Sequence, residues 1–90
     1  MKAEAQAIVP ILKTARGQLD AVLRMIEEDK YCLDISQQLM ACEALVKKTN
    51  REVLRAHMES CVREALESGS PEDTRKKVDE LVELLARLSK

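Results

Sequence analysis

Aromatic side chains are almost missing from this chain of 90 residues, which has one tyrosine and neither phenylalanine nor tryptophan. Aliphatic side chains must therefore provide nearly all of the buried surface, and this favours packed helices over a sheet. A chain of this length forms one domain at most and buries only a modest fraction of its surface when alone. We therefore expect a single domain, residues 1–90, that gains further core by oligomerisation.

Long apolar runs and an excess of charge of one sign are also missing. No segment approaches the length of a membrane span, and the first residues lack the apolar core and cleavage pattern of a signal peptide. We therefore expect a cytoplasmic protein without membrane contact. The formal net charge of −1 excludes the overall basic excess of many nucleic-acid binders, so any DNA contact must use a local patch.

The chain also lacks the patterns of an enzyme and of a disulfide framework. It contains no glycine-rich phosphate loop and no nucleophile–base–acid constellation, so we do not expect catalysis. Its three cysteines are an odd number, which in a reducing compartment favours thiol or metal chemistry over disulfides.

Apolar residues recur in steps of four and three, which predicts an all-α protomer with helices at about residues 5–29, 33–68 and 71–88. Pro10 suggests that the regular part of the first helix begins near it. The first stripe contains Ile8, Leu12, Ala15, Leu19, Val22 and Ile26, and the second contains Ile35, Leu39, Cys42, Val46, Thr49, Val53 and Ala56.

The second helix contains neither glycine nor proline before Gly69 and should span about 50 Å at ~1.5 Å per residue. One small globule cannot cover that length, so the helix needs a partner along it, and an antiparallel copy of the chain is the simplest one. Gly69 should stop this helix, and Ser70 should cap the next one, with Pro71 in its first position and Asp73 completing a start like a capping box.

Cys32, His57 and Cys61 form the most informative pattern, C-x24-H-x3-C. His57 and Cys61 are four residues apart and so share one helix face, where they can provide half of a coordination sphere. Cys32 would lie roughly 37 Å from His57 on one straight helix. Either the chain turns back on itself or a second, antiparallel copy supplies Cys32, and we favour the second arrangement.

Three soft donors without an obvious fourth suit trigonal Cu(I), with Zn(II) as the usual competitor. On spacing alone, purely structural roles for these residues explain the pattern equally well, because cysteine is often a small buried residue and a single histidine often serves packing. Cys42, within the apolar stripe, is interpreted as such a core residue.

The chain resembles the CsoR/RcnR/FrmR-type bacterial transcriptional repressors over roughly residues 12–64. The matching stretches are Arg16-Gly17-Gln18-Leu19-Asp20-Ala21, Met25 to Cys32, Ser36-Gln37-Gln38-Leu39 and Arg51-Glu52-Val53-Leu54, together with His57 and Cys61. This resemblance implies an antiparallel four-helix-bundle dimer, pairing again into a tetramer, that binds operator DNA without effector and releases it when the effector binds.

In the copper-sensing branch the ligands come from two protomers and correspond to Cys32, His57 and Cys61. Tyr31 is similar to a tyrosine beside the ligands of that branch, and Glu80 is a candidate acidic neighbour. Residues 1–10 contain no His or Cys and Cys61 is present, which favours copper over the nickel and cobalt sensors. Formaldehyde sensors lack a cysteine at the position of Cys61, so the presence of Cys61 does not fit that branch.

Two alternatives remain. A sister branch senses persulfides through cysteines at the positions of Cys32 and Cys61, and that chemistry needs no His57. The other alternative is a copper-binding bundle without DNA binding, because relatives carry several basic residues before Gly17 where this chain has only two. The candidate DNA-binding residues are Lys13 and Arg16 in the first helix, and Lys47, Lys48, Arg51 and Arg55 in the second, although an ordinary solvated face explains the second group equally well.

Overall fold

The computed structural model describes residues 1–88, which form three helices: α1 (Ala5–Glu27), α2 (Cys32–Ser68) and α3 (Pro71–Leu88). The predicted all-α class is confirmed, and the predicted third helix has the observed bounds. Helix α1 ends two residues earlier than predicted and α2 begins one residue earlier, because the chain turns at Asp29, where φ is 53°. No helix in the described part of the chain is long and apolar enough to cross a membrane.

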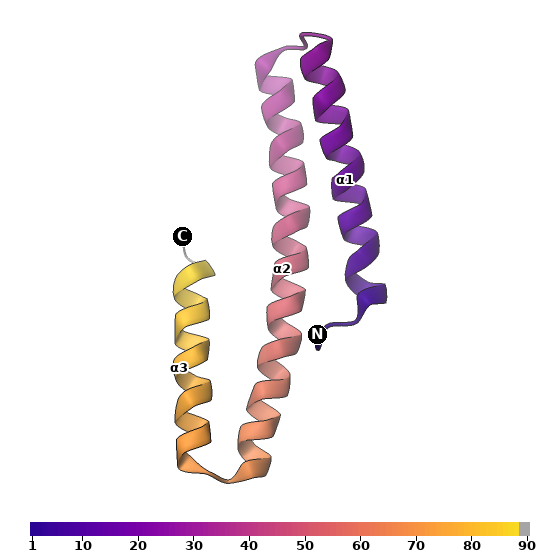
Figure 1. Ribbon diagram of the computed structural model, residues 1–90. Coiled ribbons are helices and arrows are strands. Elements are labelled where there is room, and N and C mark those ends of the chain that lie inside the picture. The colour runs from indigo at the N-terminus through magenta and orange to yellow at the C-terminus, as the bar shows by residue number, and fades with distance from the viewer. Residues whose placement is uncertain (89–90) are drawn as a thin grey trace.

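Helices α1 and α2 form an antiparallel hairpin, and α3 folds back along the last part of α2 on the other side (Figure 1). Among the described residues, α1 and α3 make no contact with each other. The molecule is consequently long and flat, with principal extents of 59 × 28 × 12 Å. Helix α2 is the common support on which both other helices lie.

The hairpin core is built from residues seven apart, a spacing that returns nearly to the same helix face after two turns. Ile8, Ala15 and Val22 are buried on α1, opposite Cys42 and Thr49 of α2. The Cys42 thiol donates a hydrogen bond to the Ala15 carbonyl oxygen at 3.5 Å, which confirms that Cys42 is a core residue and marks the register of the two helices.

The other half of each predicted stripe is exposed. The large apolar side chains of the stripes that lie outside the hairpin interface are 43–57% exposed. They are Leu12, Leu19, Ile26, Leu39 and Val46. No large side chain in the described residues is fully buried. An apolar face of this kind is what a partner helix surface would cover.

Helix α1 begins at Ala5, as predicted, but the suggestion that its regular part begins near Pro10 is wrong, because this residue lies inside the helix. Proline removes the bond from its own N–H to the carbonyl oxygen of Gln6. Gln6 and Pro10 are both exposed, so water can hydrate that carbonyl at little cost.

The stop at Gly69 and the cap at Ser70 are confirmed, but the reciprocal bond of a capping box is not formed, because the Ser70 backbone N–H donates to the Ser68 hydroxyl at 3.3 Å. Gly69 ends α2 in the left-handed conformation, with φ of 62°. The Asp73 backbone N–H donates to the Ser70 hydroxyl at 3.4 Å, so Ser70 caps α3, and Pro71 occupies the first helical position where no N–H is needed.

Candidate metal centre and nucleic-acid interface

His57 and Cys61 lie one turn apart on α2, and their side chains meet. The His57 Nε2 atom is 3.3 Å from the Cys61 Sγ atom. Cys61 is only 5% exposed, whereas the His57 side chain is 43% exposed. The helix therefore holds a thiol and an imidazole side by side, with the sulfur covered and the ring accessible.

Glu80 of α3 joins this pair from the other helix. Its Oε1 atom lies 2.8 Å from His57 Nε2, and the possible ligand atoms of His57, Cys61 and Glu80 all fall within 4.8 Å of one another. The hydrogen bond with His57 lowers the pKa of the Glu80 carboxyl below its ordinary value, an effect that the charges of His57 and Lys77 increase and partial burial opposes. Glu80 is therefore an anionic acceptor that orients the imidazole.

Cys32 and Tyr31 lie at the opposite end of the same helix. Tyr31 is the N-cap residue of α2, Cys32 is its first residue, and both side chains are exposed. Because α2 continues without a break from Cys32 to Ser68, Cys32 and His57 are separated by roughly 37 Å. The chain does not turn back between them, so one protomer does not bring the three predicted ligands together.

The basic candidates occupy separate surfaces. Lys13 and Arg16 flank Ala15 on α1 and are exposed. On α2, Lys47 and Arg51 lie roughly 140–180° around the helix from Cys42, which faces α1, at ~100° per residue. The α1 pair and the α2 group therefore point to different sides of one protomer.

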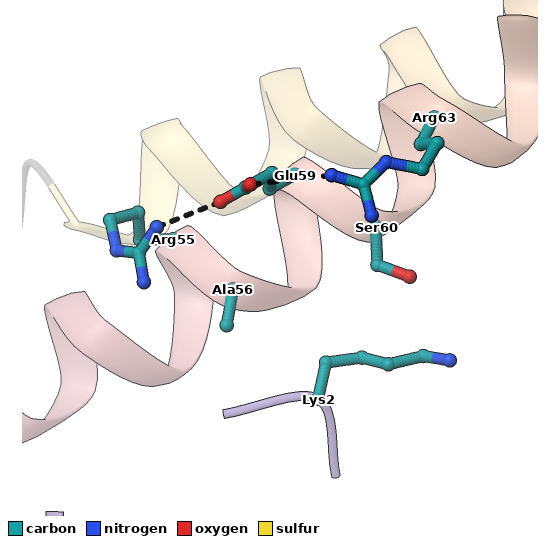
Figure 2. A pocket seen from close by; sticks show the side chains of 6 residues that line it. All are labelled: Lys2, Arg55, Ala56, Glu59, Ser60 and Arg63. Carbon is teal, nitrogen blue, oxygen red and sulfur yellow. Dashed lines mark hydrogen bonds and ion pairs between the residues drawn. The ribbon is translucent and has the colours of Figure 1, made fainter. Parts of the chain in front are cut away.

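Arg55 differs from its basic neighbours because carboxylates enclose it. Its guanidinium donates two hydrogen bonds to Glu52, at 2.7 and 3.0 Å, and one to Glu59 at 2.8 Å. Figure 2 shows Glu59 between Arg55 and Arg63 along α2, with an ion pair to each. Lys2 of the N-terminal segment lies on the other side of the pocket. These contacts raise the pKa of Arg55 and lower that of Glu52, so both groups stay charged and Arg55 already has two carboxylate partners.

The model of the metal-sensitive transcriptional repressor family matches residues 4–87. This chain belongs to that family. It is a family of transcriptional repressors and not of enzymes, in agreement with the expectation from the sequence.

Similar proteins within the family carry more specific names. The copper-sensing transcriptional repressor CsoR of Mycobacterium ulcerans is 40% identical over 80% of this chain and 59% of its own length. The CsoR of Bacillus subtilis is 32% identical over 97% of this chain and 83% of its own length. This chain therefore spans less than two thirds of the mycobacterial relatives that it matches.

A solved structure agrees with the fold. The crystal structure of the copper-sensing repressor CsoR with Cu(I) from Geobacillus thermodenitrificans is similar, with a TM-score of 0.78 and 30% identity. The similarity covers 96% of this chain and 86% of that one. The three-helix arrangement is thus shared over nearly the whole chain.

Proposed function

We propose that this protein is a Cu(I)-responsive transcriptional repressor. In this proposal it binds operator DNA without copper and is released when copper binds between two protomers at Cys32, His57 and Cys61. The observation that carries the proposal is the His57–Cys61 pair at 3.3 Å, with Cys32 at the far end of the same unbroken helix. Its copper-sensing relatives support the choice of effector.

The donor atoms fit Cu(I). Thiolate sulfur and imidazole nitrogen are soft donors of the kind that this ion prefers, whereas carboxylate oxygen suits hard cations. We therefore assign Glu80 to holding the ring and not to the ion. Glu80 contacts Nε2, the same ring nitrogen that faces the Cys61 sulfur at 3.3 Å, so copper bound through Nε2 beside Cys61 would displace the carboxylate, and Glu80 holds the ring in the copper-free protein.

An antiparallel second copy would complete the site. Running two α2 helices in opposite directions puts the start of one beside the end of the other, so the exposed Cys32 of each copy can approach His57 and Cys61 of its partner. The uncovered apolar residues described above support such a dimer, since a bundle would bury them. We further propose that dimers pair into a homotetramer and that residues 1–90 act as one domain in the cytoplasm.

The two helices at the site provide a way to couple copper to DNA. Helix α3 is tied to α2 by the His57–Glu80 hydrogen bond, so a change at His57 alters the position at which α3 is held. Copper needs only to favour one packing of the bundle over another, and we expect a coupling free energy of about 1–3 kcal/mol. The DNA contacts in this proposal are Lys13, Arg16, Lys47, Lys48, Arg51 and Arg55, with Arg55 contributing least.

An anaerobic titration of the reduced protein with Cu(I), against a competing chromophoric chelator, tests the site. We expect one tightly held Cu(I) per protomer, with greatly weakened binding in His57→Ala, Cys32→Ala and Cys61→Ala. Weak binding that does not depend on His57 would contradict the proposal and point to persulfide chemistry at Cys32 and Cys61.

Mixing two inactive variants tests whether the site lies between subunits. After subunit exchange, Cys32→Ala and Cys61→Ala protomers can form mixed dimers. One site of each mixed dimer then has an intact Cys32 from one copy and an intact His57 and Cys61 from the other. Recovery of strong copper binding on mixing supports the intersubunit site, whereas a site within one protomer recovers nothing.

A further inference from the structure

A second basic feature lies where the end of α3 meets the middle of α2 (Figure 1). It is an open cleft of about 500 Å³. The residues that line it are Lys47, Asn50, Arg51, Arg87 and Leu88. Two of its three cations belong to the α2 group already described, and the third, Arg87, comes from a helix that the sequence pattern gives no reason to place there.

The register of α2 and α3 explains how Arg87 arrives. The two helices are antiparallel, and the His57–Glu80 hydrogen bond sets one residue of α2 opposite one residue of α3. Seven residues back from His57 is Asn50, and seven residues on from Glu80 is Arg87. Seven residues make nearly two turns, so Asn50 and Arg87 face each other about 10 Å from the metal pair.

The cleft retains more free positive charge than the pocket of Figure 2. Arg51 has no ion pair within residues 1–88, while Lys47 and Arg87 each have one partner at 3.1 Å, Glu43 and Glu83. The side chains of both carboxylates are more than 60% exposed, and exposed ion pairs of this kind are weak. By contrast, the pocket of Figure 2 contains Arg55, which is held by two carboxylates.

We propose that this cleft binds a phosphate of the DNA backbone, with Arg87 closing it from α3 against Lys47 and Arg51 of α2. The inference rests on the proposed repressor function and adds both a residue and a partner group to it. Guanidinium groups match phosphate oxygens bidentately, and the Asn50 amide adds a donor between them. A contact with the backbone positions the protein on DNA and reads no sequence.

The test uses the full chain, Arg87→Gln, and fluorescence anisotropy with a labelled DNA duplex from the protein's own promoter region. Arg75→Gln is the matched control, because Arg75 is an exposed cation on α3 that lies outside the cleft. Arg87→Gln should weaken binding about three- to tenfold for each engaged protomer, the loss of roughly one net hydrogen bond. The slope of log K against log[salt] should also become shallower by about 0.9 for each lost contact.

A second variant should move binding in the opposite direction. Glu83→Gln removes the carboxylate that competes for Arg87, and it should tighten DNA binding while Arg75→Gln changes the affinity only slightly. Circular dichroism and copper stoichiometry, both expected to be unchanged, verify that each variant is folded.

The outcomes separate this inference from the proposed function. If the wild type binds the duplex while Arg87→Gln keeps the wild-type affinity and salt slope, the cleft is not a phosphate site and the repressor proposal stands. If Arg75→Gln weakens binding as much as Arg87→Gln does, only the general charge of α3 matters and the cleft is again excluded. If the wild type binds no DNA at low salt, both proposals fail.

Discussion

Replacing Cys42 and Cys61 separately by alanine should divide the two roles of cysteine in this chain. Both thiols are 5% exposed, so burial does not distinguish them. Their neighbours do: the Cys42 sulfur faces the Ala15 carbonyl oxygen in the hairpin, whereas the Cys61 sulfur faces the His57 imidazole. Cys42→Ala should therefore reduce stability and keep copper binding, and Cys61→Ala should lose strong copper binding.

The expected stability loss for Cys42→Ala follows from what the sulfur contacts. Removing one buried heavy atom, similar in size to a methylene, costs about 0.8 kcal/mol of burial. The 3.5 Å hydrogen bond from the thiol is long and adds about 0.5 kcal/mol. A small cavity brings the total to about 1–2 kcal/mol, which lowers the melting temperature by roughly 5–10 °C in a domain of this size.

Thermal and urea unfolding, followed by circular dichroism, measure the stability of each variant. The anaerobic Cu(I) titration measures its copper affinity. All samples need the same protomer concentration, because an oligomer melts at a temperature that depends on concentration. Undiminished stability in Cys42→Ala together with a loss of copper would refute the assignment of Cys42 to the core. Full copper affinity in Cys61→Ala would refute the assignment of the ligand.

Three further results are expected. Gly69→Ala should cost about 1–2 kcal/mol in urea unfolding, since φ is 62° there and a new Cβ meets no atom within 4 Å, so backbone strain alone sets the loss; a neutral result would contradict this. Leu19→Glu places a charge on the uncovered apolar face and should shift the sedimentation profile toward monomer, whereas an unchanged profile would mean that this face is not the interface. The hydrogen bond from Arg55 lowers the pKa of Glu52 below 4.5, so its contribution to stability is present above pH 4.5 and lost as the pH falls through the lowered folded value. An NMR titration of Glu52 should show this low midpoint, and Arg55→Gln should raise it; identical midpoints would show that the pair does not form in solution.

The helices were predictable because their signals are local. Apolar residues at steps of three and four, a long interval without glycine or proline, and the Ser70 cap all act within a few turns of chain. The stripes were predicted less completely: Ala15 and Cys42 are buried as expected, but Leu19 and its equivalents are exposed. A stripe indicates which face is apolar, and the number of partner helices decides how much of that face one protomer covers.

The candidate site also has one part that local sequence predicts and one part that depends on how the helices pack. The proximity of His57 and Cys61 follows from a spacing of four on a helix, which the sequence states directly. The approach of Glu80 from α3 depends on the register between two helices. The sequence allowed Glu80 as a candidate, but it contained no signal for its distance to the imidazole, and Arg87 had no local signal at all.

The sequence by itself therefore determined three helices, the stop and cap between α2 and α3, and the thiol–imidazole pair, since each depends on residues close together in the chain. The tertiary structure decided which residues of α2 and α3 face each other, and it is this register that sets Glu80 against His57 and Arg87 against the α2 cations. The physical reason is that register depends on how side chains of two helices interlock along their whole length. A shift of one turn would leave every helix intact and separate both pairs.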